Sequence, residues 1–77
     1  MTSKLGQLIQ EIRTPDYSTR EFASLLGVMP ATVNRWEKGI HNPRPANIRK
    51  LKEIAPNRIE AIDRAIEADR ANHKEEP

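Results

Sequence analysis

Residues 18–39 read STREFASLLGVMPATVNRWEKG, and this stretch decides the fold. Ser18, followed three positions later by Glu21, forms a capping box, in which each side chain bonds the backbone amide of the other residue. Gly27 suits the left-handed residue that ends such a helix, and Pro30 suits the first position of the next one. The sequence therefore predicts two short helices joined by a tight turn, which is the arrangement of a helix-turn-helix.

The second of these helices has two chemically different sides. At about 100° per residue, Val33 and Trp36 fall on one side and are expected in the core. The opposite side carries Ala31, Asn34, Arg35 and Lys38. The major groove of DNA offers partners for such a set, because Asn pairs with adenine, Arg with guanine, and a small apolar residue meets the thymine methyl group. The alternative interpretation is a helix face that is simply solvated.

Three further helices are predicted around this unit by apolar residues at helical spacing. They cover residues 3–13, a segment that begins at Pro45, and residues 57–70 with Asn57 as the cap. The apolar positions are Leu5, Leu8, Ile9 and Ile12 in the first helix, Phe22, Leu25 and Leu26 in the second, Ile48, Leu51 and Ile54 in the fourth, and Ile59, Ile62 and Ile66 in the fifth. No stretch alternates at period two, so an all-α fold is expected. Residues 71–77 have nothing apolar to bury and are expected to be disordered.

Composition narrows the class of protein. The chain has 77 residues and no cysteine, and its two histidines lie far apart. Disulfide bonds and a structural metal site are therefore excluded, and one apolar core must stabilise a single domain. No apolar run reaches the roughly 18 residues that a membrane helix needs, and no signal-peptide stretch is present. We expect a cytoplasmic protein that does not contact membranes.

Charge is distributed unevenly along the chain. Residues 1–58 hold ten Lys and Arg against five Asp and Glu, a net charge of +5, whereas residues 59–77 hold three against six, a net charge of −3. A basic body indicates a polyanionic partner, although an ordinary solvated surface would look the same by charge alone. The acidic C-terminal helix would be repelled by DNA and is expected to point away from it.

The motifs of residues 18–39 resemble the Cro/repressor-type helix-turn-helix family, which is also called the XRE family. The most specific pieces are Phe22-Ala23, Leu26-Gly27-Val28 and Arg35-Trp36-Glu37-Lys38-Gly39, and the match covers about residues 4–55. The resemblance implies a compact five-helix, lambda-repressor-like fold, with a DNA-binding domain over residues 1–56 whose second and third helices form the helix-turn-helix. Residues 57–70 would then pack on this domain or serve in dimerisation.

The resemblance also implies where DNA would be contacted. The groove-facing positions of the third helix are Pro30, Ala31, Asn34 and Arg35. Backbone contacts are expected from the start of the second helix, from the third helix and from the loop and helix that follow it: Thr19, Arg20, Thr32, Lys38, His41, Asn42, Arg44 and Asn47. Arg13 and Glu37 match a pair that forms a structural ion pair in the family. Arg49, Lys50 and Lys52 are interpreted as solvated surface.

The start of the third helix departs from the family pattern. Met29-Pro30-Ala31 stands where the family has polar residues. Base readout is therefore expected to rest on Asn34 and Arg35, with methyl contacts from Ala31 and Thr32.

These features predict a sequence-specific regulator of transcription, a repressor, that binds double-stranded DNA and associates with the nucleoid. It could act as a homodimer. The alternative is a protein-interaction module, such as an antitoxin or an adaptor, whose partner binds the acidic helix at residues 57–70. An enzyme is not expected, because Ser18 and Ser24 have no base nearby in the sequence and no metal or cofactor site is apparent.

Overall fold

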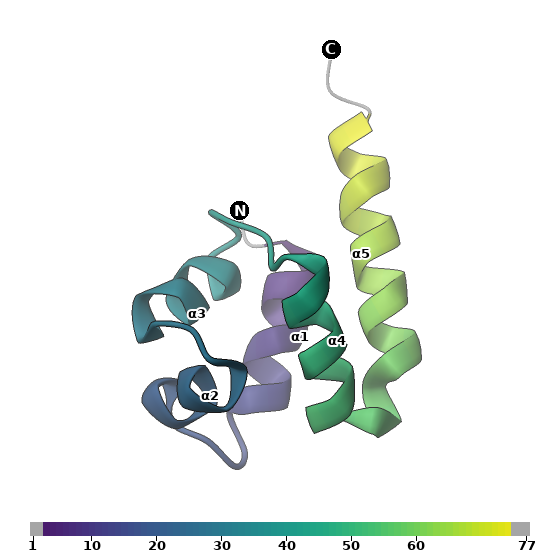
Figure 1. Ribbon diagram of the computed structural model, residues 1–77. Coiled ribbons are helices and arrows are strands. Elements are labelled where there is room, and N and C mark those ends of the chain that lie inside the picture. The colour runs from purple at the N-terminus through teal and green to yellow at the C-terminus, as the bar shows by residue number, and fades with distance from the viewer. Residues whose placement is uncertain (1–2, 75–77) are drawn as a thin grey trace.

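The computed structural model describes residues 3–74, with side-chain detail for residues 3–71 (Figure 1). Its elements are α1 (Lys4–Arg13), α2 (Thr19–Leu26), α3 (Pro30–Glu37), α4 (Pro45–Ile54), the short 3-10 helix η1 (Pro56–Arg58) and α5 (Ile59–Lys74). No strand occurs within these described residues, so the predicted all-α, five-helix fold is confirmed.

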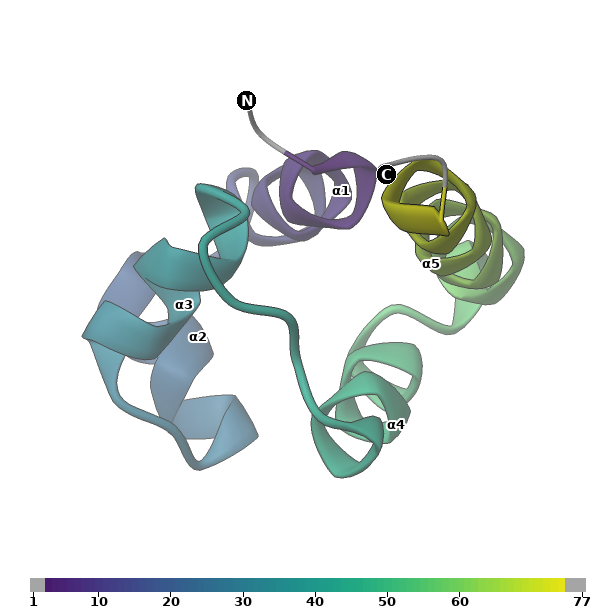
Figure 2. The same ribbon diagram turned by 90° about the horizontal axis from the view of Figure 1, so that it is seen from above.

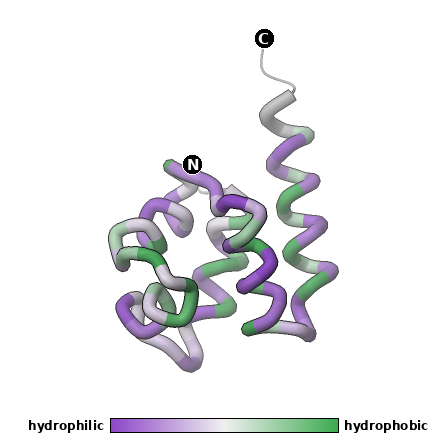
Figure 3. Tube along the Cα trace, in the orientation of Figure 1, coloured by the Kyte–Doolittle hydropathy of each residue, from purple (hydrophilic) through white to green (hydrophobic). Residues whose placement is uncertain are grey.

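The helices surround a common core. In Figures 1 and 2, α2 and α3 lie together on one side, α5 lies on the opposite side, and α1 and α4 lie between them. Each of the five α-helices contributes at least one side chain with essentially no exposed surface: Ile9, Phe22, Leu26, Val33, Leu51 and Ile62. Trp36 is only 3% exposed, which confirms its predicted place in the core. Along α5, hydrophobic and hydrophilic stretches follow one another (Figure 3), as in an amphipathic helix.

The capping box at the start of α2 and the glycine at its end are both present, as the sequence predicts. The Glu21 amide donates to Ser18 Oγ at 3.1 Å, and the Ser18 amide donates to Glu21 Oε1 at 2.9 Å. Gly27 ends the helix with φ of 71°, a left-handed conformation that costs little without a Cβ. The capping box and the glycine together fix both ends of α2 and therefore the direction in which α3 begins.

Gly6 allows α1 to approach the end of α3 closely. A Cβ at this buried position would collide with the carbonyl oxygen of Trp36 and lie 2.9 Å from that of Glu37. Both obstacles are backbone atoms, which cannot move away as a flexible side chain could. The absence of a side chain at Gly6 therefore sets how tightly α3 is held against α1.

The start of α1 is joined to α5 by a carboxylate. Asp69 accepts hydrogen bonds from the backbone amides of Lys4 at 2.9 Å and Leu5 at 3.0 Å, while Ser3 Oγ accepts from the Gly6 amide at 2.9 Å. These amides are the ones that a helix N-terminus leaves without intrahelical partners. We refer to the two bonds made by Asp69 as the Asp69 clamp, since they hold α5 against α1.

Three details of the sequence prediction are wrong. Leu25 is 50% exposed, because the side of α2 that meets the core is occupied by Phe22, Ala23 and Leu26. Asn57 does not cap α5; it lies inside η1, before α5 begins at Ile59. Helix α5 also continues to Lys74, beyond the predicted end at residue 70, so that residues 71–74 are helical. Residues 75–77 of the predicted disordered tail lie outside the described residues.

Candidate nucleic-acid interface

The outer face of α3 is open to solvent. Ala31, Asn34, Arg35 and Lys38 are exposed, and Pro30 and Thr32 are half-buried. Val33 and Trp36, on the other side of the helix, are buried. The helix thus presents an amide, a guanidinium and an ammonium outward from a rigid support.

An ion pair holds the end of α3 in place. Arg13 Nε donates to Glu37 Oε2 at 2.6 Å, and Arg13 Nη2 donates to Glu37 Oε1 at 3.3 Å. The two side chains are only 16% and 11% exposed, which protects the pair from solvent screening. The pair that the family resemblance implies is therefore present, and it links α1 to the end of α3. Glu37 is occupied by this contact and leaves no free negative charge beside the outer face of α3.

The basic side chains divide into two groups. Arg13, Lys52, Arg58, Arg64 and Arg70 form ion pairs. The other described cations have no ion-pair partner within the described part of the chain: Lys4 in α1, and six from α2 through α4, namely Arg20, Arg35, Lys38, Arg44, Arg49 and Lys50. Of the three acidic residues of this segment, Glu21 and Glu37 are hydrogen-bonded, one in the capping box and one to Arg13, and Glu53, near the end of α4, is exposed. Positive charge is therefore left unneutralised where the sequence predicts a polyanionic partner.

The remaining predicted backbone contacts lie between the start of α2 and the first turn of α4. Thr19 and Arg20 begin α2, Lys38 is the C-cap of α3, and Arg44 is the N-cap of α4. His41 and Asn42 are exposed in the loop that connects α3 with α4, whereas Thr19 and Asn47 are half-buried.

One contact between α4 and the end of α2 could not be predicted from the sequence. Lys50 Nζ donates to the carbonyl oxygen of Leu26 at 3.3 Å, at the C-terminal end of α2. A cation is favourable there because the end of a helix carries partial negative charge. Lys50 is therefore not plain solvated surface but connects α4 to the turn before α3. Lys52 is also engaged, in an ion pair with Asp63 at 2.8 Å. No local pattern could have indicated either partner.

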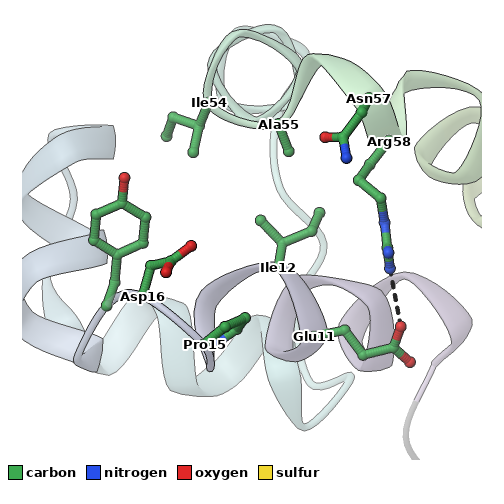
Figure 4. A pocket seen from close by; sticks show the side chains of 9 residues that line it. Glu11, Ile12, Pro15, Asp16, Ile54, Ala55, Asn57 and Arg58 are labelled. Atoms are coloured by element: carbon green, nitrogen blue, oxygen red, sulfur yellow. Dashed lines mark hydrogen bonds and ion pairs between the residues drawn. The ribbon is translucent and has the colours of Figure 1, made fainter.

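A shallow groove lies elsewhere on the molecule (Figure 4). It is formed by the end of α1, the loop that follows α1, the end of α4 and η1, and Glu11 and Arg58 pair across its edge at 3.0 Å. No residue of α2 or α3 lines it. Within residues 3–71, no three potential metal-ligating side chains come together. The groove is thus separate from the outer face of α3.

The fold and this face define a class of protein: a helix-turn-helix domain with its second helix displayed outward. A family model described as helix-turn-helix matches residues 9–54, which is more than half of the chain. The chain therefore belongs to the Cro/repressor-type, or XRE, helix-turn-helix family and is a DNA-binding protein. The family is one of regulatory DNA-binding domains and is generally not enzymatic. No curated protein matches the chain. None of the helices described here has the length and apolarity needed to span a membrane.

Proposed function

We propose that this protein is a sequence-specific transcriptional repressor that reads the major groove of double-stranded DNA with α3. The observation that carries the proposal is the outer face of α3, where Asn34 and Arg35 are exposed and have no side-chain partner among the described residues. These groups serve no purpose in the core. They match the hydrogen-bonding groups that base edges display in the major groove.

Each of the two polar side chains has a preferred base. Asn34 forms a bidentate pair with adenine, and Arg35 forms one with guanine at its O6 and N7 atoms. Each such contact discriminates against the wrong base by about 1–3 kcal/mol. Ala31 is small enough to let the helix approach the base edges.

The unpaired cations supply the part of the affinity that does not depend on sequence. Arg20, Lys38 and Arg44 lie at the ends of three helices and approach phosphates rather than bases. Thr19, Thr32, His41, Asn42 and Asn47 add polar contacts to the backbone. Such contacts fix the position of the protein on the duplex and release counterions.

Repression follows from occupancy, since a protein lying in the major groove blocks other proteins from the same DNA. In a two-fold dimer the two copies of α3 would be separated by about 34 Å, one turn of the duplex. This arrangement predicts an operator that is an inverted repeat.

A protein-interaction module that uses α5 is the weaker candidate. Such a module needs an apolar stripe on α5 that its own domain does not cover. Ile62 and Ala65 are 0% and 7% exposed, and Ile66 packs against the core, so most of the stripe is occupied. Ile59, at 39% exposure, is the most open isoleucine of this helix, and Ile66 is half-buried.

Selection of bound duplexes from a randomised pool, at about 0.15 M salt to limit non-specific binding, tests the proposal. An enriched inverted repeat supports a dimeric reader, and a single enriched half-site supports a monomeric one. If the folded protein enriches no sequence, DNA reading by α3 is overturned and partners of α5 become the subject of the search.

Two variants then assign the readout. Arg35→Ala is expected to weaken operator binding by about 1–3 kcal/mol and to relax specificity at one base pair, and Asn34→Ala should do the same at another. Arg64→Ala is the matched control, because this exposed arginine lies on α5, on the side of the molecule opposite α3 (Figure 2). Unchanged specificity in Arg35→Ala would contradict its role.

A further inference from the structure

Met29 is a large apolar side chain with no place in the core. It is 70% exposed, more than Leu25 at 50%, Ile40 at 62% or Ile59 at 39%, the other exposed large apolar residues of the described chain. It occupies the N-cap position of α3, where a polar residue would ordinarily accept a backbone hydrogen bond, and it makes no side-chain cap. Neither packing nor capping explains a methionine at this position.

Met29 also belongs to a continuous apolar stretch at the start of α3. Pro30 and Ala31 follow it, and Ala31 is exposed. Neither offers a side-chain hydrogen-bonding group. The stretch continues into the polar outer face of the same helix, where Asn34 and Arg35 are exposed. An apolar and a polar surface thus adjoin on one short helix.

The major groove has one apolar feature that such a stretch can recognise. In helix-turn-helix complexes the N-terminal residues of the recognition helix contact base edges. Those edges display hydrogen-bonding atoms and a single apolar group, the C5-methyl group of thymine. A methionine is well suited to this contact, because its unbranched, polarisable side chain adapts to irregular apolar surfaces.

We propose that Met29 determines specificity by packing against the C5-methyl group of a thymine in the operator. This inference rests on the proposed function, since it requires α3 to lie in the major groove. It adds a residue and a chemical group to that function: a pyrimidine is selected by its methyl group rather than by hydrogen bonds. The same contact accepts 5-methylcytosine in preference to cytosine, because both methylated bases carry the group at C5.

Replacing thymine with deoxyuridine, one position at a time in the selected operator, tests the contact directly. The replacement removes the methyl group and leaves every hydrogen-bonding atom in place. Burial of one such group corresponds to about a fourfold change in affinity, so one position per half-site is expected to show a loss of this size in the wild-type protein. Cytosine at that position should bind more weakly than 5-methylcytosine.

The variant Met29→Ala should bind the thymine and deoxyuridine operators with equal affinity at that position. Because Met29 is exposed, its replacement should leave the thermal unfolding temperature unchanged, so a loss of discrimination cannot be attributed to misfolding. Ile40→Ala is the matched control: it removes a similarly exposed apolar side chain after α3 and should keep the fourfold difference. Ala31→Gly shows whether the neighbouring methyl group carries the effect instead.

The outcomes separate this inference from the proposed function. If no operator can be selected, both are overturned. If the operator is bound but deoxyuridine causes no loss at any position, or if Met29→Ala retains the full difference, only the role of Met29 is overturned. A difference that disappears in Ala31→Gly but not in Met29→Ala likewise overturns it.

Discussion

At the scale of single residues, Gly6 shows how a missing side chain can position a functional helix. The backbone of α1 approaches the carbonyl groups of Trp36 and Glu37 at the end of α3. The Arg13–Glu37 ion pair joins the same two helices. Close backbone contact and an ion pair thus act together on the end of α3, so the exposed side chains of that helix are held at a defined distance from the core.

Gly6→Ala is expected to destabilise the protein. Alanine favours a helix by about 1 kcal/mol over glycine, but its Cβ would overlap backbone atoms, and overpacking of this kind costs about 1–3 kcal/mol or more. Denaturant unfolding measures the difference. Gln7→Ala, an exposed position on the same helix, is the control and should change stability by less than about 0.5 kcal/mol. A Gly6→Ala variant as stable as the wild type would show that α1 and α3 can separate without cost.

At the scale of secondary-structure elements, the start of α2 carries a titratable contact. The hydrogen bonds from the Ser18 amide and then from the Ser18 side chain lower the pKa of Glu21 below its ordinary value of 4.5. Because the folded-state pKa is lowered, the stabilisation is fully present above about pH 4.5 and is lost as the pH falls through the lowered pKa.

Ser18→Ala should raise the pKa of Glu21 toward 4.5, since it removes one of the two bonds that favour the charged carboxylate. It should also destabilise the protein by about 0.5–2 kcal/mol at neutral pH, as the loss of an N-cap usually does. Side-chain NMR titration of Glu21 and urea unfolding provide the two measurements. Ser24→Ala, exposed on the same helix, should affect neither. An unshifted Glu21 in the wild-type protein would contradict the capping box.

Helix α5 carries two carboxylates, Asp69 and Asp63, whose contacts with the rest of the protein differ. Asp69→Ala removes both bonds of the Asp69 clamp and is expected to cost about 0.5–2 kcal/mol, with faster amide hydrogen exchange at Lys4 and Leu5. Asp63→Ala removes an exposed ion pair with Lys52 and should cost less than about 1 kcal/mol. Equal effects of the two substitutions on exchange at the start of α1 would show that the clamp contributes nothing.

Sequence reasoning predicted the elements better than the contacts between them. The capping box, the turn at Gly27 and the buried Trp36 follow from residues close together in the chain. Gly6 and Lys50 were missed because their partners lie more than twenty positions away, where no local pattern indicates contact.

The misplaced details have the same origin. Helical spacing alone predicts that both Leu25 and Leu26 lie in the core, because it cannot tell which of two adjacent leucines faces inward; in the structure only Leu26 does. The polarity of residues 71–74 indicates disorder in the sequence, but these residues contain neither proline nor glycine, so nothing in them stops helix α5. The base contacts remain a prediction, since they depend on a partner.

At the scale of the whole molecule, charge separates along the axis that runs from α3 to α5. Apart from Lys4 in α1, the cations without ion-pair partners among the described residues occupy α2 through α4. Helix α5, which carries the exposed acidic residues Glu60 and Glu67, lies on the side of the molecule opposite α3 (Figure 2). An electrostatic field of this form attracts DNA to one face and orients the protein as it approaches.

The salt dependence of binding should therefore differ between the two sides. Arg44→Ala is expected to weaken binding on every DNA sequence and to reduce the slope of log affinity against log salt concentration by about one. Arg64→Ala, an exposed arginine of α5, should leave that slope unchanged. Fluorescence anisotropy across a salt series measures both, and a slope unaffected by Arg44→Ala would refute the phosphate contact.

The Asp69 clamp also has a consequence for synthesis on the ribosome. The carboxylate that completes the first turn of α1 is added 64 residues after the amide of Leu5 that it binds. At about 5–20 residues per second, translation leaves that turn without its carboxylate for roughly 3–13 s. Helices α2 and α3 are neighbours in sequence and have both been translated long before then. The residues of the recognition unit therefore exist in the nascent chain before the carboxylate that links α1 to α5, so the Asp69 clamp can form only after α2 and α3 have been translated.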